Sequence, residues 1–550
     1  MGLLTNDPDH VARATGFDSW YNSLPAHLSL DGFRTELPLV HIPDEGRATV
    51  MMKEIDRTNI GLGVDGEVEV IFHNPYFTFD ATLKPSDAVA DVIAAAGKRV
   101  GPSDVLDDRL PVGLHDRLAS ELKIATKQNA HFVVPCYSYT LSRADVARSF
   151  ARGFRSTIDA AKPRIDALGA SGSLSPFLDG GADDSLGPLD SMFEEFGVDI
   201  LLVSSPLNVQ ELTGFPMGLL GRDVWAVLER GSNEINVLSR RELPWFQPGK
   251  NRLESDLAAR FDAGGAVGYE DLDLSVAAMR GFGIDRASAV PVSEMLRRWR
   301  ERRSWRDVPF YVLASDITLR ALENALGGLE SALSNGEQVS ELAVYRRYRE
   351  TVDEIISGED LPLRVETYFT HTHAGSRSLL PARATDFSLG NLTSLKMDAG
   401  LLVYDEFGLY RAVSDVTRSF VVSEKARWFY DLLDRALVSG AIAECKAGRT
   451  GEEVFRSGMA YLEPHREEIV AAGFAPDVAS LTDSFKRDIG HLLGKEEPAT
   501  VGLKLGNHET LEAGMVGAAE FQWPFRDHCI GVEDLFLVTE GEPVNLTRPQ

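Results

Sequence analysis

Two stretches in the last third of the chain are predicted to form β-hairpins with paired carboxylates, and this pairing restricts what the chain can fold into. The first hairpin joins SLKMDAG to VSDVTRSF, with a turn predicted at residues 405–408. With those four residues in the loop, Tyr404 pairs with Leu409. Counting outward from that pair places Asp398 directly opposite Asp415.

The second hairpin joins AGMVGAAEFQWP to CIGVEDLFLVT, and a loop at residues 525–528 places Glu520 opposite Glu533. The Cβ atoms of such cross-strand pairs lie only about 4.5–5.5 Å apart, so facing carboxylates destabilise the strands unless a cation neutralises them. A solvated surface pair is the alternative for either hairpin alone. Two such hairpins in one region favour a bound divalent cation.

A histidine between the two hairpins offers a nitrogen ligand. His491 in RDIGHLLGKEEP follows Gly490 and precedes Gly494, and both glycines allow tight backbone turns that hold the imidazole out. Two aspartates, two glutamates and one histidine form an oxygen-rich donor set. Such a set suits a pair of first-row divalent ions.

These residues resemble, in order and spacing, the motifs of the metallopeptidase family that contains aminopeptidase P, prolidase, methionine aminopeptidase and creatinase. The motifs are MDAG (397–400), SDVTRSF (414–420), GHLLG (490–494), LEAGMVGAAE (511–520) and GVEDLFLVT (531–539). The resemblance implies a pita-bread fold with a dinuclear metal site between two antiparallel sheets. It also implies the metal ligands: Asp398 on the first ion, Asp415 and Glu533 bridging both ions, and His491 and Glu520 on the second.

The chain also departs from the family pattern at three positions. The family's histidine upstream of the first aspartate is missing, and Pro381 stands near its expected place. Lys495 stands where a second histidine is usual, and Gly531 where an arginine often precedes the last glutamate. These departures imply that the metal site is kept and the substrate pocket is rebuilt.

Other histidines are candidates for the missing catalytic groups. His371 and His373 in YFTHTHAGS are two residues apart, so on a strand they share one face, upstream of Asp398. His528 lies in the loop predicted for the second hairpin and could reach the mouth of the site. For all three the alternative is an ordinary titratable side chain at a strand end or in a surface loop.

Three further side chains have two readings each. Lys495, followed by Glu496 and Glu497, is either an anchor for a substrate carboxylate or part of a solvated run of ion pairs, and we favour the second. Trp523 and Phe525 either wall the pocket or belong to the core.

The predicted fold class is α+β, with a C-terminal pita-bread metal domain at residues 311–550 and one or two creatinase-like α/β domains before it. A stretch rich in Gly, Ser and Asp at 168–188 is predicted to be a linker or flexible loop. It separates a domain at 187–310, which resembles the creatinase N-terminal domain, from residues 1–180. The first 180 residues are either a degenerate repeat of that domain or an unrelated α/β extension.

The composition of the chain indicates which classes of binding partner are disfavoured and which cellular compartment is expected. A net charge of −27 disfavours nucleic acid and anionic membranes as partners. The three cysteines show no paired spacing, and the N-terminal residues lack a secretory pattern, so a reducing cytoplasm is expected. No apolar run approaches the roughly 20 residues that span a bilayer.

Together these features predict a dinuclear metal-dependent hydrolase that cleaves an amide-type C–N bond, with Xaa-Pro peptides as the narrower substrate class. Manganese or iron is expected, with zinc or cobalt as alternatives. Glu520 is the expected proton shuttle. The resemblance implies a homodimer acting on a short peptide or other small molecule. The alternatives are a creatinase-like hydrolase or a lyase on the same fold, and a non-catalytic binding module.

Overall fold

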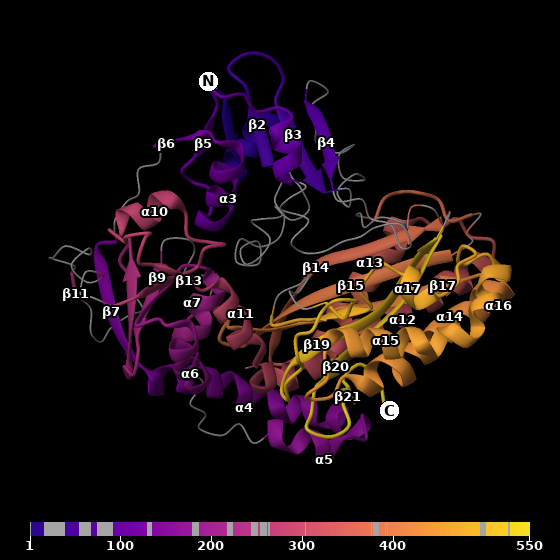
Figure 1. Ribbon diagram of the computed structural model, residues 1–550. Coiled ribbons are helices and arrows are strands. Elements are labelled where there is room, and N and C mark those ends of the chain that lie inside the picture. The colour runs from indigo at the N-terminus through magenta and orange to yellow at the C-terminus, as the bar shows by residue number, and fades with distance from the viewer. Residues whose placement is uncertain are drawn as a thin grey trace. The chain divides into compact units, whose positions relative to one another are not determined.

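The computed structural model describes residues 2–15, 39–53, 68–73, 92–128, 135–178, 186–216, 224–243, 251–252, 261, 265–302, 304–375, 377, 384–390, 392, 394–495, 502–525 and 528–549 (Figure 1). The chain divides into two compact units. The first comprises Met1–Pro75, Leu83–Ala151 and Ala182–Trp299, and the second comprises Tyr76–Thr82, Arg152–Gly181 and Arg300–Gln550. Among the described residues, no helix is both long and apolar enough to cross a membrane.

The first unit contains a mixed sheet, here called the first sheet, built from the N-terminal strands. Its order is β4 (Glu69–His73), β3 (Thr49–Lys53), β2 (Leu39–Ile42), β1 (Leu3–Thr5), β5 (Val105–Asp107) and β6 (Ala125–Lys127). Helices α1 (Pro8–Thr15) and α3 (Val112–Leu122) belong to the same region. Buried apolar side chains of these strands and of α3, including Leu4, Met51, Leu106 and Leu118, form its core.

The second sheet of this unit is also mixed. Its order is β11 (Asn251–Arg252), β7 (Tyr137–Ser142), β10 (Glu234–Ser239), β9 (Val224–Glu229), β8 (Ile200–Val203), β12 (Val267–Tyr269) and β13 (Val290–Pro291). The helices of this region are α6 (Gly187–Phe196), α7 (Pro206–Thr213), α10 (Val276–Gly281) and α11 (Ser293–Arg302). Trp225 and Phe282 meet edge to face at 5.3 Å in the core of this region.

The second sheet crosses the domain boundary that composition suggests. Strand β7 lies before residue 180, yet it pairs along its length with β10. Within the stretch read as a linker, α5 (Ser171–Leu174) follows α4 (Arg143–Ala167), and α6 begins at Gly187. Residues 179–185 lie outside the described part. The division into 1–180, 187–310 and 311–550 therefore stays a prediction.

The second unit contains two further sheets. The third sheet consists of β14 (Leu363–Ala374), β15 (Ser394–Asp405), β16 (Tyr410–Val413) and β17 (Val416–Val421). The fourth consists of β18 (Gly490–Leu492), β19 (Val516–Phe525), β20 (His528–Leu537) and β21 (Val544–Asn545). They pack against each other through β15, β17 and β20.

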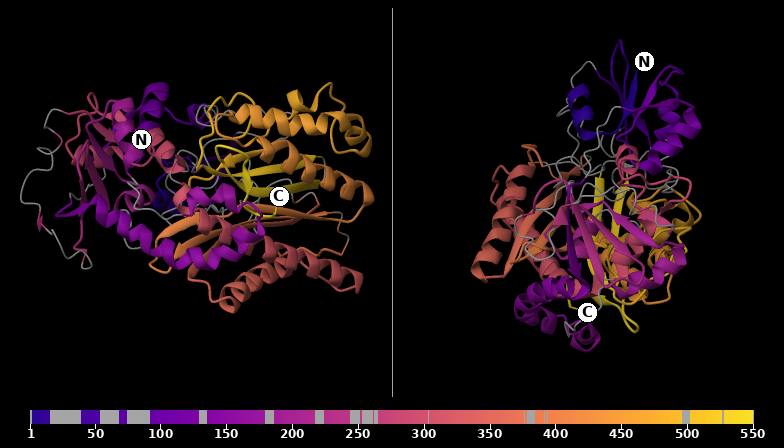
Figure 2. Two further views of the ribbon diagram at one scale, coloured as in Figure 1. Left: turned by 90° about the horizontal axis from the view of Figure 1, so that it is seen from below. Right: turned by 90° about the vertical axis from the view of Figure 1, so that its left-hand side faces the viewer.

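Helices cover the outer faces of these two sheets, as the left view of Figure 2 shows. Helices α12 (Val308–Ser334) and α13 (Glu341–Gly358) pack on the third sheet. Helices α14 (Glu424–Ala436) and α15 (Gly451–Leu462) lie on the side of the fourth sheet, followed by α16 (Arg466–Ala472) and α17 (Leu481–Ser484). Local capping fixes where three of them begin: Ser340, Ser423 and Thr450 each accept a hydrogen bond from a backbone N–H in the first turn.

Alternation along β19 separates an apolar face from a polar one. Phe521 and Trp523 point into the core shared with α14, α15 and α17, where Trp523 stacks on Phe485 at 4.7 Å. The indole Nε1 of Trp523 donates a 2.7 Å hydrogen bond to the carbonyl of Phe474. Trp523 is thus a core residue and not a pocket wall. Glu520 and Gln522, on the opposite face, point toward the third sheet.

The two predicted hairpin registers had different outcomes. The second is confirmed, because Glu520 pairs with Glu533 and Phe525 with His528. The first is wrong: Tyr404 pairs with Tyr410, a bulge follows, and Asp398 faces Thr417. The longer turn and the extra bulge residue together shift the register by two. Asp415 lies between β16 and β17, outside the paired strands.

Candidate metal centre

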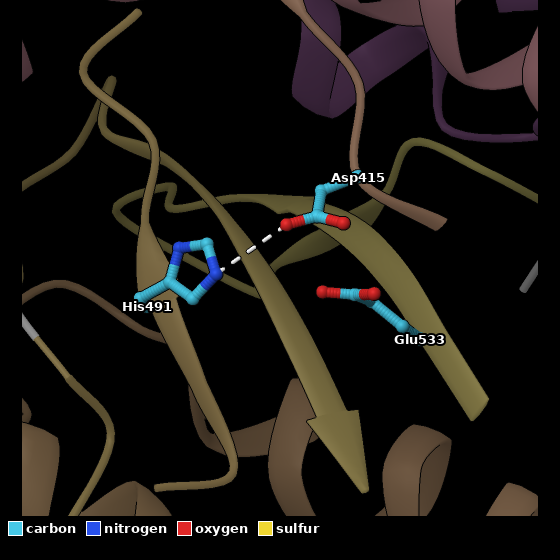
Figure 3. Close-up of side chains that lie close together, drawn as sticks. All are labelled: Asp415, His491 and Glu533. Carbon is cyan, nitrogen blue, oxygen red and sulfur yellow. Dashed lines mark ion pairs between the residues drawn. The ribbon is translucent and has the colours of Figure 1, made fainter. Parts of the chain in front are cut away.

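Three of the five predicted ligands meet in the interior of the second unit. One donor atom each from Asp415, His491 and Glu533 lies within 4.8 Å of the others (Figure 3). All three side chains are buried, and Nε2 of His491 lies 3.4 Å from Oδ2 of Asp415. Such a buried cluster of two carboxylates and an imidazole has the donors and the spacing to hold a divalent ion.

Each of the three is presented by a different local structure. Asp415 lies in the connection between β16 and β17, His491 lies on the short strand β18, and Glu533 lies within β20. The predicted backbone turns around His491 are confirmed, because Gly490 has φ +132° and Gly494 has φ +49°. The imidazole is therefore fixed by glycines on both sides.

Glu533 is the buried acid of the cluster whose carboxylate is only partly satisfied by hydrogen bonds from the described residues. Its Oε2 accepts a 2.9 Å hydrogen bond from the Thr417 hydroxyl, whereas its Oε1 has no hydrogen-bond partner within the described part of the chain. Burial, together with the charges of Asp415, Glu520 and Asp398, raises the pKa of Glu533 well above its ordinary value, although His491 opposes this. A buried carboxylate in this position needs a proton or a metal ion.

Glu520 faces Glu533 across β19 and β20 and is itself 8% exposed. Its backbone N–H donates to the carbonyl of Ile489, which ties β19 to the segment that carries His491. Burial raises the pKa of Glu520, and the charges of Asp488 and Asp398 act in the same direction, against Arg487 and His491. The crowding of acids therefore extends beyond the three-donor cluster.

Asp398 lies beside the cluster, on the face of the third sheet that is turned toward the fourth. It faces Thr417 on β17 and His371 on β14. Its Oδ2 lies 3.4 Å from Nζ of Lys396 and 3.4 Å from Nε2 of Gln522. Asp398 and Glu520 are not among the three donors that lie within 4.8 Å of one another, but the charges of both act on Glu533.

The prediction that His371 and His373 share a face agrees with the structure. Their rings lie 6.3 Å apart, and they pair across β14 and β15 with Asp398 and Lys396, respectively. Both are buried on the face turned toward the metal ligands. His371 is thereby the histidine adjacent to a predicted ligand.

His373 is held by an acid from a neighbouring helix. Glu341 is the first residue of α13, and its Oε2 lies 3.8 Å from Nδ1 of His373. Its Oε1 accepts a 2.9 Å hydrogen bond from Nε of Arg377. Burial alone would raise the pKa of Glu341, but hydrogen bonds from His373, Arg377 and the Ala374 N–H lower it to about 2. Glu341 therefore fixes the end of β14 that carries both histidines.

Lys495 is not part of a solvated run of ion pairs, so the expectation favoured from its neighbours is wrong. Its side chain is buried, and Nζ lies 2.7 Å from Oδ2 of Asp307. Its carbonyl accepts a 2.9 Å hydrogen bond from the Tyr410 hydroxyl. Asp307 also pairs with the buried Arg411. This network fixes the segment just after His491.

Several residues discussed in the sequence analysis lie wholly or partly outside the described residues. The backbone of His528 pairs with that of Phe525, but the side chains of both residues lie outside the described part. Pro381, with Glu496 and Glu497, also lies outside it.

Three polar residues near the ligands were missed in the sequence: Lys396, Thr417 and Gln522. Lys396 comes two residues before Asp398, and Gln522 two residues after Glu520, so each shares a strand face with a ligand. Thr417 donates to Glu533 and also accepts a 2.7 Å hydrogen bond from Nε2 of Gln522. A period of two around each ligand could have found them.

Comparisons with known proteins identify the family and the fold of the domain that carries these residues. The sequence model of metallopeptidase family M24 matches residues 313–540. An uncharacterized peptidase of Bacillus subtilis (strain 168), YqhT, is 24% identical over 346 residues, which is 60% of this chain and 88% of that protein.

Solved structures share the fold. The prolidase of Pyrococcus horikoshii OT3 has a TM-score of 0.51 at 19% identity, covering 67% of this chain and 99% of that one. An X-prolyl aminopeptidase of Caenorhabditis elegans, described as a cytosolic enzyme with a di-nuclear active site, has a TM-score of 0.58 at 12% identity. That match covers 98% of this chain and 83% of the other. The α+β fold class is thus confirmed, and this chain carries, at residues 313–540, a pita-bread domain of metallopeptidase family M24.

Proposed function

We propose that the chain is a dinuclear metal-dependent hydrolase that cleaves an amide-type C–N bond. The observation that carries this proposal is the buried group of Asp415, His491 and Glu533, with donor atoms within 4.8 Å of one another. The buried Oε1 of Glu533, which has no hydrogen-bond partner among the described residues, and the match of residues 313–540 to a metallopeptidase family support a bound cation here.

In this proposal Asp398 would hold one ion, His491 and Glu520 would hold the other, and Asp415 and Glu533 would contribute to both. A pair of divalent ions supplies an activated water and polarises a carbonyl oxygen. Four carboxylates and one imidazole favour manganese or iron, with zinc or cobalt as alternatives.

The remaining chemistry is assigned to the chain's own side chains. Glu520 faces Glu533 and is positioned to accept a proton from the attacking water and to pass it to the leaving nitrogen. His371 and His373, on the face that carries Asp398, are the candidate donors to the oxyanion that develops on the substrate. His528 remains a third candidate, because its backbone closes the hairpin that carries both glutamates.

Short peptides with proline next to the cleaved bond are the proposed substrates. The likeness to a prolidase and to an X-prolyl aminopeptidase supports this choice. A creatinase-like hydrolase or a lyase is the second candidate, and the absence from the sequence of the family's histidine near Pro381 favours it. A cytoplasmic location and a homodimer complete the proposal.

Metal content tests the proposal directly. Elemental analysis after dialysis should show bound metal in the unchanged protein and a loss of most of it in Asp415→Asn. The matched control is Asp431→Asn, since Asp431 is exposed on α14. Equal metal content in all three proteins would contradict the proposal.

A substrate panel separates the two enzyme candidates. The metal-loaded protein is incubated with Xaa-Pro dipeptides, with longer Xaa-Pro peptides, with peptides lacking proline and with small non-peptide amides. Cleavage confined to the proline peptides supports the narrower class. Turnover of the non-peptide amides alone would favour the second candidate.

A further inference from the structure

A buried lysine lies beside one of the proposed metal ligands. Lys396 is 6% exposed, and its Nζ lies 2.8 Å from Oε1 of Gln522 and 3.4 Å from Oδ2 of Asp398. A buried ammonium needs such partners, because leaving it unpaired in the interior costs several kcal/mol. Asp398 therefore already has a positive charge within contact distance.

The opposite sheet leaves room for this lysine. A Cβ atom added at Gly531 would lie 2.5 Å from Oε1 of Gln522 and 3.1 Å from Cδ of Lys396. A larger residue there would push the amide and the lysine apart. Gly531 thus belongs to the same arrangement as Lys396 and Gln522.

The two sides of the metal centre consequently differ in charge. On the side of Asp415, His491 and Glu533, one buried carboxylate oxygen has no hydrogen-bond partner in the described residues. On the side of Asp398, an ammonium and an amide N–H lie within 3.4 Å of one carboxylate oxygen. A divalent ion that binds there meets the repulsion of a fixed positive charge nearby.

We infer that the ammonium of Lys396 acts as a built-in cation at Asp398, so that the centre holds one divalent ion firmly and a second only in competition with Lys396. This inference rests on the proposed function. It predicts an enzyme whose ion at Asp398 is readily lost and exchanged, while the ion at Asp415, His491 and Glu533 stays bound.

Titration with Mn²⁺ alone tests the inference without an activity measurement. The chelator-stripped protein is titrated by calorimetry, and the bound metal is counted after gel filtration in metal-free buffer. The unchanged protein should retain about one equivalent, and Lys396→Met should retain about two. The second dissociation constant should be at least about tenfold lower in Lys396→Met, because the repulsion is removed.

Two matched variants make the result specific. Lys425→Met removes an exposed lysine from α14 and should behave like the unchanged protein. Lys396→Arg keeps the positive charge and should also retain about one equivalent. Circular dichroism confirms that each variant is folded, and if Lys396→Met does not fold, Lys396→Gln takes its place.

The outcomes separate this inference from the proposed function. Two equivalents of equal affinity in the unchanged protein, or an unchanged second affinity in Lys396→Met, would overturn the inference and leave the proposed function standing. Binding of no Mn²⁺ by any of the proteins would overturn both.

Discussion

The hydroxyl of Thr417 on β17 donates a 2.9 Å hydrogen bond to Oε2 of Glu533 on β20, and this contact joins the two sheets beside the three-donor cluster. The same oxygen of Thr417 accepts a hydrogen bond from Gln522. Thr417 therefore both orients a proposed bridging ligand and bonds to a polar residue that contacts Asp398.

Replacing this threonine should weaken both the fold and the metal site. In Thr417→Val the free energy of unfolding should fall by about 1–3 kcal/mol, because Oε2 of Glu533 and the Gln522 amide lose a buried partner. Urea denaturation measures the stability. Titration with Mn²⁺ should show a higher dissociation constant for the ion held by Asp415, His491 and Glu533. Ser419→Ala is the control: Ser419 also bonds across the sheets, to the backbone of Gly531, so it should cost stability without changing the metal affinity.

Stabilisation by metal should grow as the pH rises. The pKa of Glu533 is raised by burial and by neighbouring acids, so in the metal-free protein its ionisation opposes folding. Below the ordinary glutamate pKa of 4.5 this destabilisation is absent. It increases as the pH rises from 4.5 toward the raised pKa of Glu533. A bound cation removes it, because the ligands then stay ionised without repulsion.

Thermal unfolding with Mn²⁺ and with EDTA across a pH series measures this effect. The difference in Tm should widen from mildly acidic to neutral pH, and Asp415→Asn should show little difference at any pH. A metal-induced shift that is the same at every pH would contradict the assignment.

His371 should matter for turnover and not for metal uptake. It pairs across the strands with Asp398 and is buried on the same face of the sheet, so it lies next to a proposed ligand. In His371→Gln, kcat should fall about 100-fold, the effect of losing one oxyanion donor, while metal content stays unchanged. His465→Gln is the control, because His465 is at the surface beside Glu468. Unchanged kcat would remove His371 from the mechanism.

Glu341 should stabilise the protein at neutral pH and lose that effect in acid. Its pKa is about 2 against an ordinary 4.5, so it contributes on the order of 3 kcal/mol above the unfolded pKa, lost as the pH falls toward 2. The stability deficit of Glu341→Gln should therefore be large at pH 7 and shrink below about pH 4.5. Urea denaturation at several pH values measures it, with the exposed Glu323→Gln as control. A deficit that does not change with pH would point to packing instead.

The sequence by itself determined the candidate ligands and the register of one of the two predicted hairpins. Glu520 and Glu533 face each other because a short, direct hairpin fixes its own register, and counting along the chain is then sufficient. The same strand period carries His371 and His373 to one face. The glycines around His491 likewise specify their turns locally.

The tertiary structure alone decided how the other residues meet. A longer turn and an extra residue in β16, neither of which the sequence pattern predicts, place Thr417 and not Asp415 opposite Asp398. The burial of Lys495 depends on Asp307, and the contact of Lys396 with Gln522 depends on the packing of two sheets. Local propensity and strand period act over a few residues, whereas these two contacts join residues more than a hundred positions apart, and only the packed interior brings them together.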